Sequence, residues 1–149
     1  MRPSYFDDIK VGTKTVSKPK LVTKEEIIDF ATKYDPQPFH IDEEAAKNSI
    51  YGGLIASGWH TASMMMRMLV DNMDNETAGL GSPGFDDLRW LVPVRPGDTL
   101  HMESVVSETR RSASRPDMGI VRAKVKVINQ KDEVVLSFHS IGMYKTRPE

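Results

Sequence analysis

Asp35 and His40 are the residues whose types and spacing are best suited to acid–base chemistry. They stand five positions apart in a short segment that also contains Pro36 and Pro38. Proline restricts the backbone, so both side chains can be held in position at little entropic cost. A carboxylate and an imidazole can share a bound water, one of them taking a proton while the other donates one. The segment therefore indicates a site that activates water.

Simpler interpretations of the same residues remain open. Asp35 could do no more than end the helix that precedes it. His40 and Asp42 could ligate a metal ion, although one imidazole and one carboxylate two residues apart are common and unspecific. We predict no metal site. The chain has no cysteine, which excludes disulfides, thiolate nucleophiles and thiolate metal ligands.

Helices are predicted on either side of this segment. An extended stretch over residues 14–21 leads into the first helix, which begins at Thr23. Thr23 and Glu26 form a capping box, in which each side chain satisfies a free backbone N–H of the first turn. The two prolines forbid a continuing helix, so the catalytic candidates are expected on a loop. Asp42 is a good N-cap for a second, short helix over residues 43–47.

A longer helix is predicted to open at Ser57 and Gly58 and to run to Met73. Large apolar residues recur on most of its faces, and a helix of this kind is normally buried. These residues are Trp59, Ala62, Met64, Met65, Met66, Met68, Leu69, Val70 and Met73. We therefore expect a sheet to wrap around this helix.

The chain after Gly84 is predicted to form strands. They cover residues 85–92, 99–108, about 121–127 and 134–144, with turns at 95–98 and 129–132 and a polar loop over 110–117. In the third strand, valines and an alanine alternate with Arg122, Lys124 and Lys126, so one face is apolar and the other wet, as in an antiparallel sheet. Helices followed by such strands predict an α+β fold, with the long helix packed on one face of the sheet.

Length and charge limit the remaining possibilities. The 149 residues fit a single domain, residues 1–149. The net charge of −1 gives no reason to expect nucleic acid or an acidic membrane as a partner. The longest weakly polar stretch, residues 62–70, is too short to span a bilayer, and residues 1–8 lack the apolar core of an export signal. We expect a soluble, cytoplasmic protein.

Three motifs, in this order along the chain, resemble the MaoC-like, (R)-specific enoyl-CoA hydratase family. Residues 35–42, Asp-Pro-Gln-Pro-Phe-His-Ile-Asp, are similar to the family's Asp, Asn-Pro-aliphatic-His and acid pattern. Residues 53–59 are similar to the segment that opens its central helix, and residues 93–100 to its Pro-Val-x-x-Gly-Asp-Thr-Leu block. The resemblance covers residues 6–144. It implies a hot-dog fold, in which a curved antiparallel sheet wraps around a central helix.

The resemblance also implies a reaction. In the family, the Asp and His of this motif activate water and add it in the syn sense to a trans-2-enoyl thioester, giving the (R)-3-hydroxyacyl product. Asp35 and His40 would carry this role here. The backbone N–H of Gly58 would stabilise the developing enolate, which agrees with the free N–H groups and favourable dipole at a helix N-terminus. The side chains expected to contact substrate are Gln37, Phe39, Ser57 and Trp59.

Further expectations follow from the family. The thioester would be carried by coenzyme A or an acyl carrier protein, in fatty acid metabolism or a related pathway. No metal or redox cofactor is implied. Family members pair their sheets edge to edge, which covers an otherwise exposed strand. We therefore expect a homodimer or a higher homo-oligomer.

The sequence departs from the family pattern at four positions. Gln37 replaces the usual Asn, and Phe39 replaces an aliphatic residue. Ser57 stands where many members have His, and Met66 where some have a serine that supports the catalytic His. These changes leave the Asp–His pair intact. They affect the expected choice of substrate and the rate.

Two other functions compete with the hydratase hypothesis. Hot-dog thioesterases commonly place an acid on the central helix, and residues 57–69 contain none. A non-catalytic subunit that binds acyl thioesters is disfavoured by the intact Asp35–His40 pair.

Other polar and aromatic residues receive simpler interpretations. We interpret His60 as structural and Trp90 as a packing residue, a role that Trp59 could also have. The methionines of the long helix are expected to fill the core, with an adaptable wall for an acyl chain as a second interpretation. Arg110, Arg111 and Arg115 could hold the phosphates of coenzyme A, but a solvated hairpin is the favoured interpretation.

Overall fold

The computed structural model describes residues 5–73 and 79–149. Part of the segment in which no export signal was expected, residues 1–4, lies outside the described residues. The first range contains five helical elements and two short strands, in the order η1 (Phe6–Asp8), β1 (Lys14–Val16), β2 (Lys20–Leu21), α1 (Lys24–Tyr34), α2 (Pro38–Ile41), α3 (Glu43–Lys47) and the long helix α4 (Gly58–Asp71). The strands that follow are β3 (Gly84–Trp90), β4 (Thr99–Arg111), β5 (Met118–Ile128) and β6 (Val134–Lys145).

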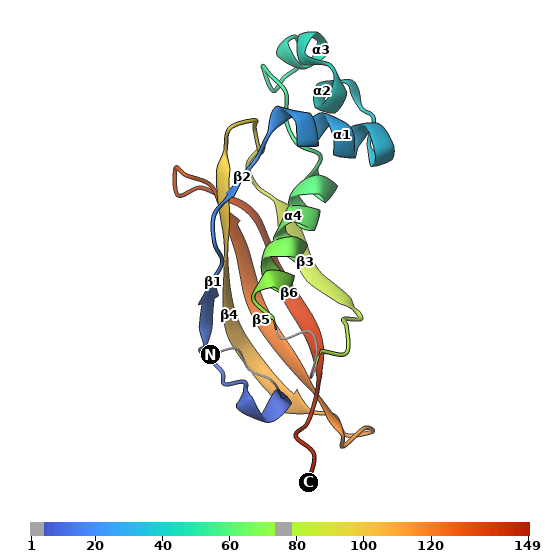
Figure 1. Cartoon of the computed structure of the whole chain (residues 1–149), viewed down its shortest axis with the longest axis vertical. Coiled ribbons are helices and arrows are strands. Elements are labelled where there is room, and N and C mark those ends of the chain that lie inside the picture. Colours follow the sequence, from blue (N-terminus) through green and yellow to red (C-terminus); the bar gives the residue numbers. More distant parts are fainter. Residues whose placement is uncertain (1–4, 74–78) are drawn as a thin grey trace.

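The strands form one curved antiparallel sheet. Its order is β1-β4-β5-β6-β3, and β2 pairs separately with β4. In β5 the predicted alternation is confirmed, since Val125 and Val127 are buried while Lys124 and Lys126 are exposed. The helix α4 lies along the sheet, and α1, α2 and α3 form a cap at the end where α4 begins (Figure 1). This is the α+β hot-dog arrangement that the sequence predicted.

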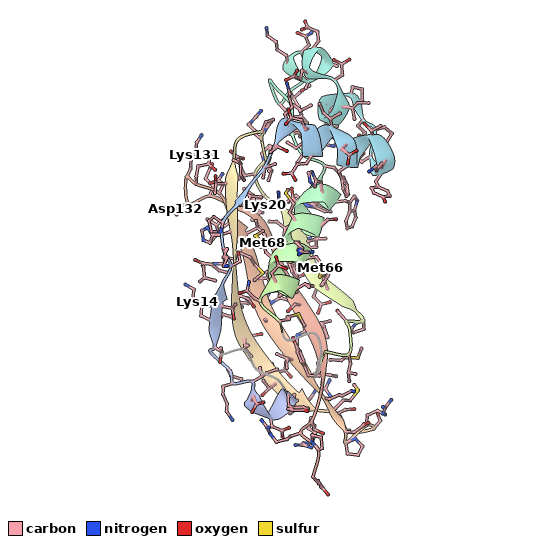
Figure 2. All side chains as sticks on the ribbon, viewed as in Figure 1. Lys14, Lys20, Met66, Met68, Lys131 and Asp132 are labelled. Carbon is pink, nitrogen blue, oxygen red and sulfur yellow. The ribbon has the colours of Figure 1, made fainter. Side chains whose placement is uncertain are left out.

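The main core lies between α4 and the sheet. Met64, Met65 and Met68 of α4 are buried in one cluster with residues of the strands, namely Leu100, Met102, Ala123, Val125, Val127, Val135, Leu136 and Phe138. The expectation that α4 is buried on nearly all sides is wrong, because the sheet of its own chain covers only one side. Trp59 and Met66 remain 60% and 37% exposed, whereas Met68 is buried. Figure 2 labels the two methionines on the helix. One face of α4 is therefore open along its length.

The capping box that was predicted for α1 is present. Thr23 Oγ1 accepts from the Glu26 N–H at 3.2 Å, and Glu26 Oε1 accepts from the Thr23 N–H at 2.9 Å. Lys20 Nζ, 3.0 Å from the same carboxylate, ties β2 to this helix. At the other end, Asp35 is the C-cap residue of α1 and its N–H donates to the Ala31 carbonyl. The simpler interpretation of Asp35 as a helix terminator is thus correct, and it does not exclude a second role.

Some predicted boundaries differ from the structure. The extended stretch 14–21 is divided into β1 and β2, since Pro19 has no N–H to donate and Ser17 Oγ accepts the Met102 N–H instead. The strand 85–92 ends at Trp90, before Pro93, and the helix expected to reach Met73 ends at Asp71.

The hairpin between β4 and β5 is tighter than predicted. Arg110 and Arg111 were placed in a polar loop, but they belong to β4 and pair with Ile120 and Gly119 of β5. The loop is shorter than predicted because the pairing of β4 with β5 extends as far as Arg111 and Gly119.

Candidate functional site

The two candidate catalytic residues come from adjacent helical elements of the cap. Asp35 ends α1, and His40 lies on α2 rather than on a loop. This helix was not predicted, because two prolines in three residues suggested irregular backbone. Pro38 instead occupies the first turn of α2, where its missing N–H costs nothing and its fixed φ favours the helix. His40 is only 4% exposed as a result.

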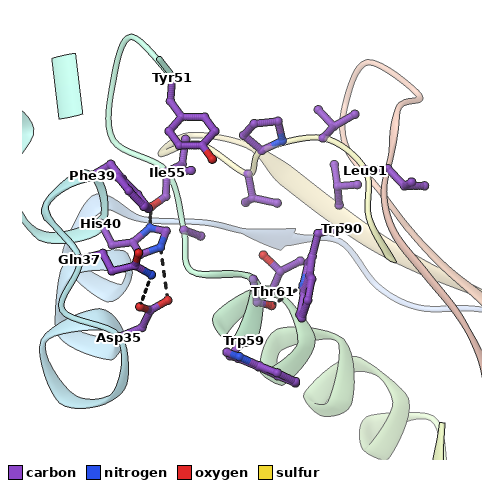
Figure 3. Close-up of a pocket in the computed structure, with 16 residues that line it drawn as sticks. Asp35, Gln37, Phe39, His40, Tyr51, Ile55, Trp59, Thr61, Trp90 and Leu91 are labelled. Atoms are coloured by element: carbon purple, nitrogen blue, oxygen red, sulfur yellow. Dashed lines mark hydrogen bonds and ion pairs between the residues drawn. The ribbon is translucent and has the colours of Figure 1, made fainter. Parts of the chain in front are cut away.

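Hydrogen bonding fixes the ring of His40 in one orientation. Its Nδ1 lies 2.7 Å from the carbonyl oxygen of Ile55 (Figure 3). A carbonyl can only accept, so Nδ1 carries the hydrogen and Nε2 holds a lone pair when the imidazole is neutral. This Nε2 lies 3.3 Å from Asp35 Oδ2. The acceptor is itself anchored, because the Ile55 N–H donates to Phe39 and the next N–H, of Ala56, donates to Val94.

Two side chains donate hydrogen bonds to the Asp35 carboxylate. Gln37 Nε2 donates to Oδ1 at 2.6 Å, and Ser57 Oγ donates to Oδ2 at 2.7 Å. Burial by itself raises the pKa of Asp35, but these two donors and the nearby His40 outweigh it, so the pKa lies below its usual value of 3.8. Asp35 is therefore a carboxylate at neutral pH. The longer side chain of Gln37 still reaches the acid.

A cavity of about 540 Å³ opens beside the pair. It brings together most of the predicted site residues, namely Asp35, Gln37, Phe39, His40, Gly58 and Trp59. Ser57 was expected to contact substrate, but it is fully buried and does not line the cavity. Its hydroxyl donates to the Asp35 carboxylate instead. The cavity thus joins the acid–base pair to the N-terminal turn of α4.

Several lining residues were missed by the sequence analysis. Tyr51, Thr61, Trp90 and Leu91 also line the cavity (Figure 3). Trp90 was interpreted as a packing residue, yet it is 44% exposed and its ring meets that of Trp59 edge to face at 5.0 Å. Nothing in the local sequence around Trp90 could have indicated this position, since it arises where the end of β3 crosses the start of α4.

Trp90 makes an unexpected contact with Gly58. Its Nε1 donates to the Gly58 carbonyl at 2.7 Å, and a Cβ at position 58 would lie 2.6 Å from Cε2 of the indole. Glycine was expected at this position to let a substrate approach the backbone. In the structure it is the indole that makes this close approach. The N–H of Gly58 has no acceptor among residues 5–73 and 79–149 and remains free to donate.

Replacing Gly58 with alanine should destabilise the protein. Alanine in place of a helical glycine usually stabilises by about 0.5–1 kcal/mol, but here the new methyl group would collide with the indole of Trp90. We expect a loss of about 1–3 kcal/mol, typical of overpacking, in chemical denaturation. In a Trp90→Ala background the same change should become neutral or stabilising. Destabilisation of equal size in both backgrounds would show that Trp90 is not the cause.

His60 lies close to this region but does not line the cavity. It is 5% exposed, and its ring stacks on Phe30 at 4.8 Å. Its Nδ1 is buried with no hydrogen-bond partner in the described part of the chain. Burial has the largest influence and lowers the pKa of His60 below 6.5. Two nearby charges have smaller effects: Glu26 raises this pKa and Lys20 lowers it. This placement agrees with a structural role.

The buried His60 should make stability depend on pH. A histidine with a lowered pKa is neutral in the folded state and must lose a proton on folding at acid pH. Its contribution is complete above the unfolded value of about 6.5 and is lost as the pH falls below it, by at most about 1.4 kcal/mol per pH unit. Denaturation of the wild type and His60→Phe from pH 8 to 5 should show the wild type losing more stability below pH 6.5. Parallel curves would contradict this.

Two of the three arginines considered for phosphate binding already have acidic partners. Arg111 lies 3.0 Å from Asp7, and Arg115 lies 3.2 Å from Asp117 within the hairpin. Neither residue lines the cavity. Among residues 5–73 and 79–149, no three His, Asp or Glu side chains gather closely enough to hold a metal ion. No helix in this part of the chain is long and apolar enough to cross a membrane.

Comparison with known proteins identifies similar chains. A family model described as "MaoC like domain" matches residues 8–130. The crystal structure of a MaoC-like dehydratase from Rhodospirillum rubrum is 41% identical, with a TM-score of 0.89 over 97% of this chain and 99% of that chain. The 3-hydroxybutyryl-CoA dehydratase of Methylorubrum extorquens is 29% identical over 72% of this chain and 67% of that protein. The (R)-specific enoyl-CoA hydratase of Rhodospirillum rubrum is 30% identical over 64% and 65%, respectively.

Proposed function

This chain belongs to the MaoC-like domain family, and on that premise we propose that it adds water to a trans-2-enoyl thioester to form an (R)-3-hydroxyacyl thioester. The single observation that carries the proposal is the placement of Asp35 and His40. Their side chains are 3.3 Å apart at the wall of a cavity of about 540 Å³ that begins at the N-terminus of α4. Hydratases and dehydratases among the relatives support the same reaction class.

The hydrogen bonds around the pair define how water would be held. Nε2 of neutral His40 and Oδ2 of Asp35 are both acceptors, and they face each other. A water molecule that donates one hydrogen to each would satisfy both. Its oxygen lone pairs would then point away from the pair and into the cavity, where the β-carbon of the enoyl group would lie.

The proton transfers follow from this arrangement. His40 Nε2 takes a proton from the water as its oxygen forms a bond to the β-carbon, and the carboxylate of Asp35 stabilises the imidazolium that results. The imidazolium then returns the proton to the α-carbon of the enolate. Hydroxyl and proton arrive from the same side, so the addition is syn. The reaction is neither an oxidation nor a reduction, and we propose that it uses no cofactor other than the carrier of the thioester.

The start of α4 would stabilise the enolate intermediate. Water addition places negative charge on the thioester oxygen, and the free N–H of Gly58 lies at the positive end of a helix of 14 residues. A donor that is already in place costs little reorganisation when the charge develops. The indole of Trp90 covers the carbonyl side of the same residue, which leaves the N–H side for the substrate.

A thioesterase is less well supported by the residues of the site. Asp71 is the one acidic residue of α4; it lies at the far end of the helix and is paired with Arg67 at 3.1 Å. Among the lining residues of the cavity, the only carboxylate is Asp35. Hydrolysis would therefore also have to use Asp35, whose position next to His40 suits the hydration better.

The proposal extends to the partners of the chain. The substrate carrier would be coenzyme A or an acyl carrier protein, in fatty acid metabolism and in the cytoplasm. A homodimer is suggested by the sheet, because β3 pairs with β6 on one side and has no strand on the other within the described residues. The exposed Trp59, Phe85 and Leu91 lie near this edge and would be covered by a second copy.

The proposed function can be tested with crotonyl-CoA. Loss of the enoyl-thioester absorbance, chiral analysis of the product and detection of free thiol would be followed in parallel. Formation of the (R)-3-hydroxy product without thiol release is expected. Release of thiol would instead identify a thioesterase. If neither occurs with crotonyl-CoA or with a panel of longer and branched enoyl thioesters, the proposed function is wrong and a binding subunit becomes the better hypothesis.

A further inference from the structure

Ser57 is placed where a serine normally caps a helix, but it does not do so. It is the N-cap residue of α4 and is fully buried, yet its side chain makes no capping hydrogen bond. An N-cap serine usually accepts from an N–H of the first turn, and losing that bond costs about 1 kcal/mol. The Ser57 hydroxyl instead donates to Asp35 Oδ2, 22 residues earlier in the chain, at 2.7 Å.

In the first turn of α4, backbone hydrogen bonds take the place of the missing side-chain cap. The N–H groups of His60 and Thr61 both donate to the backbone carbonyl of Ser57, at 3.0 and 3.1 Å. Those of Gly58 and Trp59 have no acceptor in the described residues. The serine side chain is therefore available to donate to Asp35. The two N–H groups beside the cavity remain available to donate to a ligand.

The hydrogen bond from Ser57 favours the ionised form of Asp35 and restricts the orientation of its carboxylate. A hydroxyl that donates to a carboxylate favours the ionised acid over the protonated one. Ser57 holds Oδ2, the oxygen nearest His40, while Gln37 holds Oδ1. With both oxygens held, rotation of the carboxylate would break a hydrogen bond, so Oδ2 stays directed at Nε2.

We infer that Ser57 is a positioning residue that acts through Asp35, holding its carboxylate directed at His40. This inference rests on the proposed function for its kinetic consequence, but the hydrogen bond itself can be measured without any substrate. It assigns to Ser57 a role different from contact with the substrate, and it explains why this N-cap serine leaves the helix uncapped.

Kinetics of Ser57→Ala give the first test. Loss of a hydrogen bond to a charged group should lower kcat for enoyl-thioester hydration by about 10- to 100-fold, with little change in KM. Ser57→Thr, which keeps the hydroxyl, should recover most of the activity. Ser63→Ala is the matched control, since the exposed Ser63 hydroxyl donates to the Trp59 carbonyl of the same helix and has no other partner among the residues that the structure describes.

Titration of the Asp35 carboxyl by NMR gives a second test that needs no activity. Asp35→Asn assigns the signal, and thermal melts establish that each variant is folded. The pKa of Asp35 should rise in Ser57→Ala and stay unchanged in Ser63→Ala. An unchanged Asp35 titration in folded Ser57→Ala would overturn the inference. If the wild type hydrates no thioester but the titration shifts as expected, the proposed function fails while the role of Ser57 in fixing Asp35 stands.

Discussion

Replacement of His40 with alanine is expected to lower the rate of enoyl-thioester hydration by about 10²–10⁴-fold, the usual cost of losing a positioned general base. Nε2 of His40 is the one imidazole nitrogen that the structure places against the Asp35 carboxylate, at 3.3 Å. Without it, the water would have no neutral acceptor and the enolate no proton donor. The measurement is kcat/KM for crotonyl-CoA, or for the best substrate of the panel, in purified wild type and variant.

A matched control separates this effect from loss of structure. His139→Ala removes a histidine from β6, on a strand position outside the cavity, and should keep full activity. Both variants should melt cooperatively, because His40 contributes one buried hydrogen bond to the Ile55 carbonyl and no large apolar surface. Near wild-type turnover in folded His40→Ala would mean that the catalytic centre lies elsewhere, even with the fold unchanged.

The double variant Asp35→Asn/His40→Ala is expected to be no slower than His40→Ala by itself, within a few-fold. Asp35→Asn should cost about 10²–10⁴-fold as a single change, since an amide cannot stabilise the imidazolium as a carboxylate does. Residues that act as one unit on one proton give non-additive losses. Once His40 is absent, no imidazolium forms, and the charge of Asp35 has nothing left to stabilise.

The four rates of this double-mutant cycle distinguish two mechanisms. A double variant close to the slower single variant supports joint action of Asp35 and His40 on one water. Losses that multiply would mean that the two residues act independently, for example with Asp35 as base and another group as acid. The asparagine keeps the size of the side chain and can still accept from Ser57, so the cycle tests charge with little change in packing.

The parts of the fold that depend on local sequence could be predicted. The capping box of Thr23 and Glu26 fixed the start of α1, and the alternation of β5 identified its buried face, because these patterns arise from neighbours in the chain. The short helix α2 was missed because its prediction also relied on neighbouring residues alone. Two prolines suggested a loop, but Gln37 stays extended before Pro38, so the helix can begin at the proline itself.

The exposed side of α4 shows where composition misleads. Its methionines suggested burial on most sides, whereas Met66 is 37% exposed because the sheet of this chain covers only one side of the helix. A sequence pattern records that a residue is apolar, and it does not record whether its own chain or another molecule covers it.

The candidate site was predicted in part. Asp35 and His40 could be chosen because their spacing resembles a known motif. Their orientation depends on contacts that the sequence does not encode locally: Ile55 lies 15 residues after His40, and Ser57 lies 22 residues after Asp35. Trp90 meets Gly58 from 32 residues away. Such contacts appear only when the cap, α4 and the end of β3 have come together.

Addition of water in ²H₂O tests the central claim most directly. Wild-type protein would convert crotonyl-CoA in ²H₂O, and NMR of the product would give the relative placement of deuterium at the α-carbon and hydroxyl at the β-carbon. If Asp35 and His40 handle both groups from one side, the product is a single syn isomer with the (R) configuration, and His40→Ala forms it at least about 100-fold more slowly. Anti addition, a mixture at the α-carbon, or undiminished syn product from His40→Ala would contradict the account.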